Sequence, residues 1–283
     1  MDWPAIAAAQ RQDRDARLPF VIDGQRVGSV ARAHLQALAR HPGVVRVDDD
    51  AVRLVAAAPS RDAALATLHG VLREQRLIVG WRDELVVLPD PLTLVPLARI
   101  ERAAARFWGS LTQGVHCNGY VAGADGRPLQ LWIAERAADK ATDPGLLDNL
   151  IGGGVGAGQT PWQALLREGG EEAGLAPVLL ASARPGRIVR LQRDVREGLQ
   201  HEWLHVHDLA LATDVVPHNR DGEVARFELL PVAQAIALAV SARMTVDASL
   251  VTLDFVLRHR LLPPSRLDAL AAAAAPLWVS PAA

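Results

Sequence analysis

Nine consecutive residues, Arg167-Glu168-Gly169-Gly170-Glu171-Glu172-Ala173-Gly174-Leu175, constrain this chain more than any other feature. Residues three and four apart share one face of a helix, so Glu168, Glu171 and Glu172 are predicted to point the same way. Three like charges on one face repel each other, and a fold keeps them most readily when a hard cation lies between their oxygens. Mg²⁺ suits this role because it prefers oxygen ligands and is usually bound by a few carboxylates together with substrate phosphates.

The residues around this stretch predict where its helix begins and ends. Thr160 is a suitable N-cap, and Pro161 suits the first helical position. Gly174 is well placed to end the helix. A glycine-rich stretch, residues 152–158, comes directly before it. The buried side of the helix is expected to consist of Trp162, Leu165, Leu166 and Gly169.

The whole segment resembles the box of the Nudix hydrolases. That box reads Gly, five residues, Glu, seven residues, Arg-Glu, an apolar residue, any residue, Glu-Glu, any residue, Gly and an apolar residue. Gly153 opens the box here and Leu175 closes it. Two positions depart from the family pattern: Gln159 stands where the family has Glu, and Gly169 stands where it has an apolar residue.

The resemblance implies a hydrolase of phosphoric anhydride bonds that depends on Mg²⁺ or Mn²⁺ and cleaves a diphosphate linked to an organic group. By the family pattern, Glu168 and Glu172 are expected to be direct metal ligands, and Glu171 to bind a second ion or a metal-bound water. The backbone carbonyl of Gly153 is a further expected ligand. Arg167 is expected either to pair with Glu171 or to orient Glu168.

Four residues outside the box are further candidates for the site. In many Nudix enzymes a glutamate in a later loop is the general base, and Glu223 is the best match here, with Glu202 a weaker one. Lys140 and Arg136 flank the loop before the box and are expected to face the substrate phosphates.

The rest of the chain is expected to form two α+β regions. Residues 1–108 are predicted to be an N-terminal module of short hairpins and helices, including a helix over about 97–107. Residues 109–283 are predicted to be the Nudix domain, an α/β/α sandwich with C-terminal helices. Three runs resemble a subgroup of larger Nudix proteins similar to the domain fused to thiamine pyrophosphokinase in some fungi: residues 116–120, 139–149 and 221–224.

Composition narrows the expected partners. The net charge is −2 without a basic run, so nucleic acid is not an expected partner. No stretch reaches the roughly 18 apolar residues of a membrane span, and the N-terminus lacks a signal-peptide pattern. The single Cys117 excludes an intramolecular disulfide and fits a reducing compartment, so a cytoplasmic location is expected. The oligomeric state stays open, with a homodimer as one alternative.

The expected substrate is a small-molecule diphosphate, and the resemblance favours a thiamine diphosphate-like compound. One alternative is a nucleoside diphosphate derivative such as ADP-ribose or a dinucleotide. A non-catalytic sensor of a phosphorylated ligand is another, favoured by Gln159 and Gly169. The N-terminal module is expected to line or shield the pocket.

Overall fold

A large mixed sheet carries the C-terminal region of the computed structural model, which describes residues 2–279. Its strands run in the order β13 (Val224–Pro231), β8 (Pro128–Arg136), β7 (Leu111–Ala122), β12 (Gly198–Ala210), β11 (Arg184–Val195) and β14 (Trp278–Val279). Two further strands join it, β9 (Leu147–Asp148) on β8 and β10 (Ile151–Gly154) on β7. The parallel pairing of β7 with β12 sets these two strands at the centre of the sheet.

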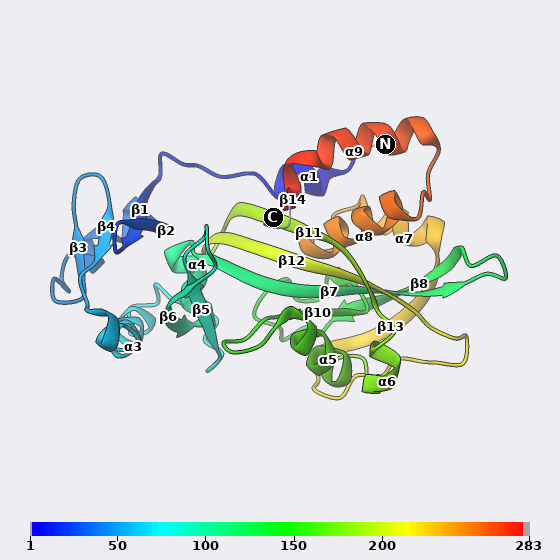
Figure 1. Cartoon of the computed structure of the whole chain (residues 1–283), viewed down its shortest axis with the longest axis horizontal. Coiled ribbons are helices and arrows are strands. Elements are labelled where there is room, and N and C mark those ends of the chain that lie inside the picture. Colours follow the sequence, from blue (N-terminus) through cyan, green and yellow to red (C-terminus); the bar gives the residue numbers. More distant parts are fainter. Residues whose placement is uncertain (1, 280–283) are drawn as a thin grey trace.

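Helices cover both faces of this sheet (Figure 1). One face carries α5 (Pro161–Glu171) and α6 (Pro177–Leu180), and the other carries α7 (Val232–Ala239) and α8 (Val246–Arg258). The terminal helix α9 (Pro264–Ala274) lies beyond α8. The predicted α/β/α sandwich is therefore confirmed.

The helix that carries the glutamates begins where the sequence predicts. The Thr160 hydroxyl accepts a hydrogen bond from the Gln163 N–H at 3.2 Å, and the Gln163 side chain accepts one from the Thr160 N–H at 2.8 Å. Gly174 adopts a left-handed φ of 64° just beyond its end. The predicted buried side is partly wrong: Leu165 and Gly169 are buried, but Leu166 is only partly buried and Trp162, on the first turn of the helix, is 37% exposed.

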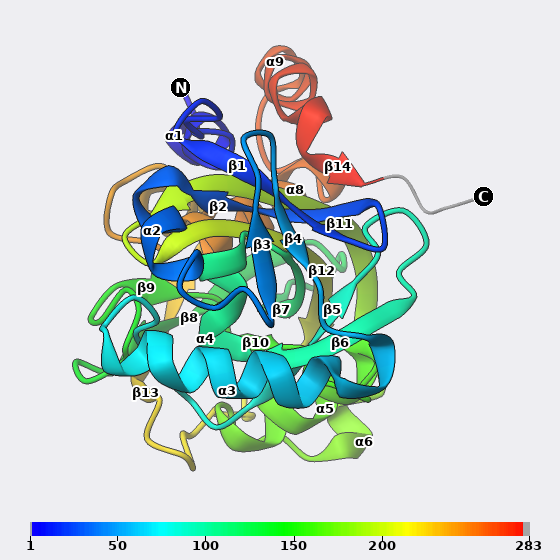
Figure 2. The same cartoon turned by 90° about the vertical axis from the view of Figure 1, so that its left-hand side faces the viewer.

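The N-terminal module has its own small sheet and core (Figure 2). Its sheet runs β2 (Gln25–Ala31), β1 (Arg17–Ile22), β4 (Val52–Leu54) and β3 (Val45–Val47), beside a hairpin of β5 (Leu85–Pro89) and β6 (Pro96–Glu101). Its helices are α2 (Leu35–Leu38), α3 (Arg61–Glu74) and α4 (Arg102–Trp108). The indole of Trp108 is buried and stacks on Phe20 with ring centroids 4.3 Å apart, so it forms core and is not available to a ligand.

The helix expected over 97–107 is wrong in its first half. Residues 96–101 form β6, in which the buried Ala98 and Ile100 alternate with the exposed Arg99. This period of two is the pattern of a strand that packs one face on a core. Only the second half is helical, as α4.

The first helix, α1 (Pro4–Ala8), was expected to be part of the N-terminal module but packs against the C-terminal region. Ala5 and Ile6 pack in the core of the C-terminal region, and the Trp3 indole N–H donates to the Ser249 hydroxyl on α8 at 2.9 Å. Figure 1 shows an extended segment that leads from α1 to β1. The core of the module ends at Trp108 while α1 packs with the C-terminal region, so the boundary at residue 108 stays a prediction that this helix does not follow.

None of the helices within residues 2–279 is long and apolar enough to cross a membrane.

Candidate active site

A cavity of about 580 Å³ lies between the N-terminal module and the C-terminal sheet. Its walls come from the glycine-rich loop, α5, the loop after β8 and the loop before β13 on one side, and from residues 79–86 and α4 of the module on the other. The expectation that the module lines the pocket is therefore confirmed. The volume suits a small-molecule ligand.

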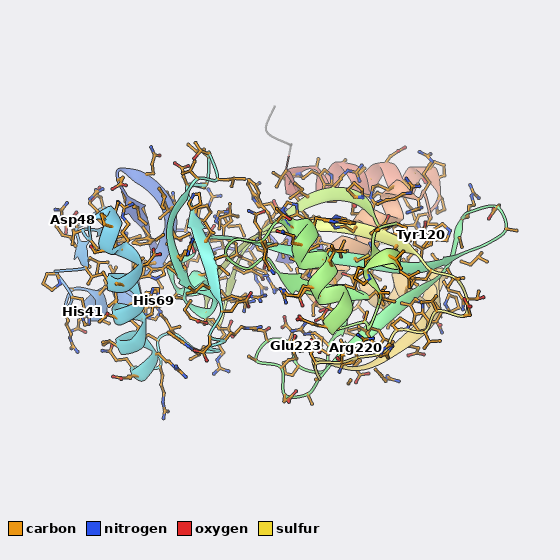
Figure 3. The ribbon with its side chains drawn as sticks, turned by 60° about the horizontal axis from the view of Figure 1, so that its bottom comes forward. His41, Asp48, His69, Tyr120, Arg220 and Glu223 are labelled. Carbon is orange, nitrogen blue, oxygen red and sulfur yellow. The ribbon has the colours of Figure 1, made fainter. Side chains whose placement is uncertain are left out.

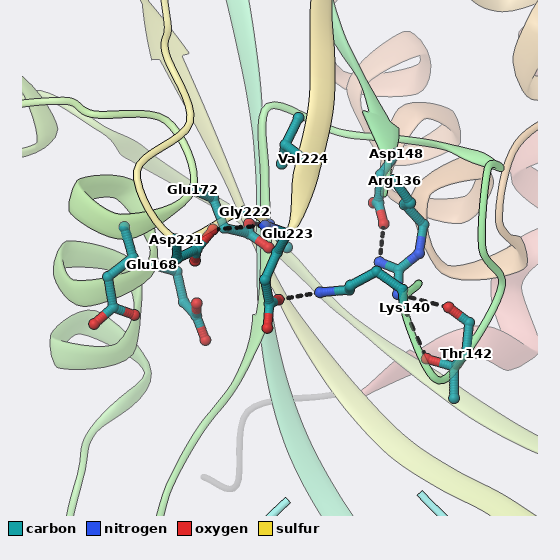
Figure 4. Close-up of polar contacts among 12 residues, drawn as sticks. Arg136, Lys140, Thr142, Asp148, Glu168, Glu172, Asp221, Gly222, Glu223 and Val224 are labelled. Carbon is teal, nitrogen blue, oxygen red and sulfur yellow. Dashed lines mark hydrogen bonds and ion pairs between the residues drawn. The ribbon is translucent and has the colours of Figure 1, made fainter. Parts of the chain in front are cut away.

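Glu172 and Glu168 are the two buried carboxylates of the helix. Glu172 is only 4% exposed and accepts a hydrogen bond from the Gly152 N–H at 2.8 Å (Figure 4). Burial and then the negative charge of Glu168 raise the pKa of Glu172 well above its ordinary value. Burial also raises the pKa of Glu168, although the charges of Arg167 and Arg102 oppose the shift. Two buried carboxylates that repel each other favour a bound cation.

Gly153 fits against Glu168 so closely that no side chain could be added to it. A Cβ on Gly153 would lie 2.0 Å from the carboxyl carbon of Glu168. The glycine loop and the first helix carboxylate are therefore in direct contact, as the spacing of the box requires.

Arg167 forms hydrogen bonds that link two glutamates of α5 to the glycine loop. Its guanidinium donates to Glu171 at 2.9 Å, to Glu168 at 2.8 Å and to the carbonyl of Gly154 at 3.1 Å. Both roles expected for Arg167 are therefore present at once. Glu171 has a side chain that is 48% exposed, so it lies at the open side of the cavity.

The donors at this face fit a hard divalent cation in their chemistry, since they are carboxylate and carbonyl oxygens. Glu168 and Glu172 would hold it, with the Gly153 carbonyl beside them. Within residues 2–279 no group of three or more His, Cys, Asp or Glu side chains is already close enough to hold a metal. The ligand set is therefore a prediction that rests on the two buried carboxylates.

Lys140 and Glu223 form an ion pair in the wall of the cavity (Figure 4). Although burial acts to raise it, the hydrogen bond and charge of Lys140 lower the pKa of Glu223. Figure 3 shows Glu223 with Arg220 in the loop before β13, far from His69 of the module. In that loop the Glu223 N–H donates to Asp221 at 2.9 Å, which fixes the turn. Glu223 is thus a carboxylate that can accept a proton.

Arg136 also lines the cavity, but its guanidinium is already engaged. It donates to Asp148 at 2.9 Å and to the carbonyl of Thr142 at 2.9 Å (Figure 4). These contacts hold the loop that carries Lys140. Phosphate binding by Arg136 stays a prediction.

The two departures from the box each have a structural account. The Gln159 side-chain carbonyl accepts a hydrogen bond from the Gly156 N–H at 3.2 Å, so it braces the glycine loop as an amide. A Cβ on Gly169 would lie 2.7 Å from both methyl groups of Leu180 and 3.1 Å from Ile151. Leu180, from α6, therefore occupies the space of the apolar residue that the family has at this position of α5.

Sequence reasoning missed the part of the site that the module supplies. Arg82 and Arg102 line the cavity, as do Asp143 and Asp247 from the C-terminal region. Glu202, considered only as a weak general base, lies in the same wall. Arg82 follows Gly80-Trp81 in a polar stretch that is typical of a solvated turn, and only the tertiary contact between the two regions places it at the site.

Comparisons with known proteins agree with this architecture. The NUDIX domain model matches residues 114–249, and a model described as a domain of unknown function (DUF4743) matches residues 3–112. Nudix hydrolase 20, chloroplastic, of Arabidopsis thaliana is 34% identical over 261 residues, which are 87% of this chain and 69% of that protein. Nudix hydrolase 24, chloroplastic, of the same plant is 34% identical over 257 residues, with the same shares covered. Among solved structures, DR0079 from Deinococcus radiodurans is 24% identical and matches 61% of this chain and 98% of its own, with a TM-score of 0.44.

Proposed function

This chain belongs to the Nudix hydrolase family, and we propose that within it the chain is a Mg²⁺-dependent diphosphohydrolase acting on a diphosphate linked to an organic cation. The observation that carries the proposal is the pair of buried carboxylates held against the glycine loop: Glu168 contacts Gly153 and lines a cavity that a small molecule can enter, and Glu172 accepts a hydrogen bond from Gly152 in the same wall. Mn²⁺ would serve the same oxygen donors.

Glu168 and Glu172 would hold the ion, with the carbonyl of Gly153, and Glu171 would hold a water bound to it. A bound Mg²⁺ supplies positive charge to the phosphate oxygens and to the charge that develops as the anhydride breaks. Arg167 acts through its neighbours, because its hydrogen bonds fix the direction of the Glu168 carboxylate and join it to Glu171.

Glu223 is the proposed general base. Lys140 lowers the pKa of Glu223 and so keeps its side chain ionised, but the ion pair between them engages the carboxylate in the structure. Lys140 is the proposed phosphate ligand. A phosphate that attracts Lys140 away from Glu223 would release the carboxylate at the moment when substrate is present.

The organic group would lie toward a second, acidic part of the cavity. Gln200 donates from one amide to Glu202 at 2.9 Å and to Asp247 at 3.0 Å, so these two carboxylates lie close together. Burial and then the charge of Asp247 raise the pKa of the neighbouring Asp143, although the charges of three arginines (Arg193, Arg136 and Arg106) oppose the shift. Negative potential of this kind complements a cationic ring. A thiamine diphosphate-like compound carries such a ring beside its diphosphate, which supports it over ADP-ribose.

The alternative of a non-catalytic sensor was favoured by two departures from the box, Gln159 and Gly169. Each has a structural explanation that is compatible with catalysis, because Gln159 braces the loop and Leu180 fills the space beside Gly169. A cytoplasmic location and a small-molecule partner remain predictions. The oligomeric state stays open, with a homodimer as one alternative.

The test is a substrate screen with the full chain in Mg²⁺, using thiamine diphosphate, its oxidised form and ADP-ribose, with release of monophosphate as the readout. Asp247→Asn is the matched probe of the acidic part of the cavity. We expect turnover of the cationic compounds, and a KM for them that rises several-fold in Asp247→Asn while the KM for ADP-ribose stays unchanged. Preferred cleavage of ADP-ribose by the natural chain would overturn the choice of substrate.

A further inference from the structure

The N-terminal module is joined to the glycine-rich loop by direct contacts. The Ala157 N–H donates to the carbonyl of Leu85 on β5 at 2.8 Å. The Arg102 guanidinium from α4 lies against Gly154, where a Cβ would be 2.4 Å from it. The glycine loop of the candidate active site is thus held from the module side as well as from α5.

Arg102 is already paired. It donates to Glu84 at 2.7 Å, and its backbone N–H donates to the carbonyl of Glu84 at 2.8 Å. Its positive charge also reaches Glu168. Arg102 therefore builds the wall of the cavity, with its charge paired to Glu84 within the module.

Arg82, in the same wall, differs from Arg102 in having no partner. Its backbone is fixed, because the Arg82 N–H donates to the buried Glu101 carboxylate at 2.9 Å, and the same oxygen caps α4 by accepting from the Ala103 N–H. Its side chain is half-buried and lines the cavity. Among residues 2–279, no carboxylate lies within ion-pair distance of its guanidinium, and that group makes no hydrogen bond.

The surroundings of Arg82 make an added anion favourable. Burial, and then the positive charge of Arg102, lower the pKa of Arg82. The charges of Glu223, which is bound to Lys140, and of Glu84, which is bound to Arg102, oppose this shift. A half-buried cation without a partner, beside other cations, is stabilised when an anion with several oxygens enters, and a guanidinium can donate two parallel hydrogen bonds to a phosphate.

We propose that Arg82 is a phosphate-binding residue of this site, so that the N-terminal module supplies the cationic half of the diphosphate subsite and Lys140 of the C-terminal region completes it. The proposal rests on the proposed function for the identity of the ligand as a diphosphate. It assigns the module a direct role in substrate binding, beyond covering the cavity.

Isothermal titration calorimetry of the full chain with methylenediphosphonate, in Mg²⁺, tests the proposal, because this probe cannot be hydrolysed at its bridging carbon. Arg82→Gln removes the charge and leaves a shorter polar side chain, and Arg82→Lys keeps the charge without the paired donors. Arg40→Ala is the matched control, since Arg40 is an exposed arginine of the same module outside the cavity.

We expect Arg82→Gln to weaken binding of methylenediphosphonate about ten- to a hundredfold, the fold-change that matches one lost charge-assisted hydrogen bond. Arg82→Lys should bind with intermediate affinity, and Arg40→Ala should bind like the natural chain. Equal affinity of Arg82→Gln and the natural chain would overturn the proposal, as would a natural chain that does not bind at millimolar probe. If the variants behave as expected but no diphosphate is cleaved, only the proposed function fails.

Discussion

Leu180 on α6 is argued to fill the space that the family fills with an apolar side chain at the position of Gly169 on α5. Substitutions at these two positions, alone and combined, test this explanation. In Gly169→Leu, the new side chain meets the methyl groups of Leu180, which would lie 2.7 Å from its Cβ. Leu180 is fully buried, and overpacking of this kind costs about 1–3 kcal/mol, occasionally more. Leu180→Ala alone leaves a cavity and should cost about 2–5 kcal/mol.

The double variant, Gly169→Leu with Leu180→Ala, moves one leucine side chain across the same space. We therefore expect it to be more stable than the sum of the single variants by at least about 2 kcal/mol, which is the coupling of residues that share one cavity. Urea unfolding followed by far-UV circular dichroism measures all three. Gly170→Leu is the matched control, because nothing lies within 4 Å of a Cβ there, and it should be neutral or slightly stabilising. Costs that simply add in the double variant would refute the reasoning.

Three further predictions concern the glycine loop and the buried carboxylates. Gly153→Ala places a Cβ 2.0 Å from Glu168 and should lower kcat by about a hundredfold or more, whereas Gly170→Ala should leave steady-state kinetics unchanged. Gln159→Glu should change kcat less than about fivefold at matched Mg²⁺, because the amide already braces the loop and a hydrogen bond is worth about 1 kcal/mol or less here; hydrolysis by the Glu form alone would contradict this. The folded-state pKa of Glu172 is raised, so its stabilising effect on metal-free protein is present at low pH and lost as pH rises through that pKa; urea midpoints in EDTA should fall with pH, and less so in Glu172→Gln.

Local sequence rules predicted the helix of the candidate site well. Thr160, Pro161 and Gly174 mark its ends because capping and left-handed backbone geometry depend on residues close in the chain. The short hairpins expected in the N-terminal module follow the same rule: β1 and β2 are joined at Asp23-Gly24, where both residues have positive φ and the turn itself selects them.

Features that depend on long-range packing were not predicted. β6 was taken for a helix because Ala and Leu in residues 97–107 favour helices, while its pairing with β5 decides otherwise. The packing of α1 on the C-terminal region depends on burial of Ile6 and on the hydrogen bond from Trp3 to Ser249 of α8. No pattern in the neighbouring sequence predicts either contact.

The same limit applies to the module side of the cavity. Arg82 is one of many arginines in the sequence. It becomes a candidate for phosphate binding only because the fold places its side chain in the wall of the cavity. The glutamates of α5 were found from the sequence because a helix places them by spacing alone. Residues contributed by the fold of a second region carry no such spacing.

The central claim is that Glu172 and its neighbours act through a divalent cation, and one measurement tests it most directly. Release of monophosphate from a cleaved diphosphate is followed for the natural chain and for Glu172→Gln, each with Mg²⁺ and with EDTA. Because a neutral amide cannot replace an anionic ligand, we expect Glu172→Gln in Mg²⁺ to be at least about a hundredfold slower, and the natural chain to be inactive in EDTA. Full turnover by the natural chain in EDTA, or by Glu172→Gln, would contradict the account.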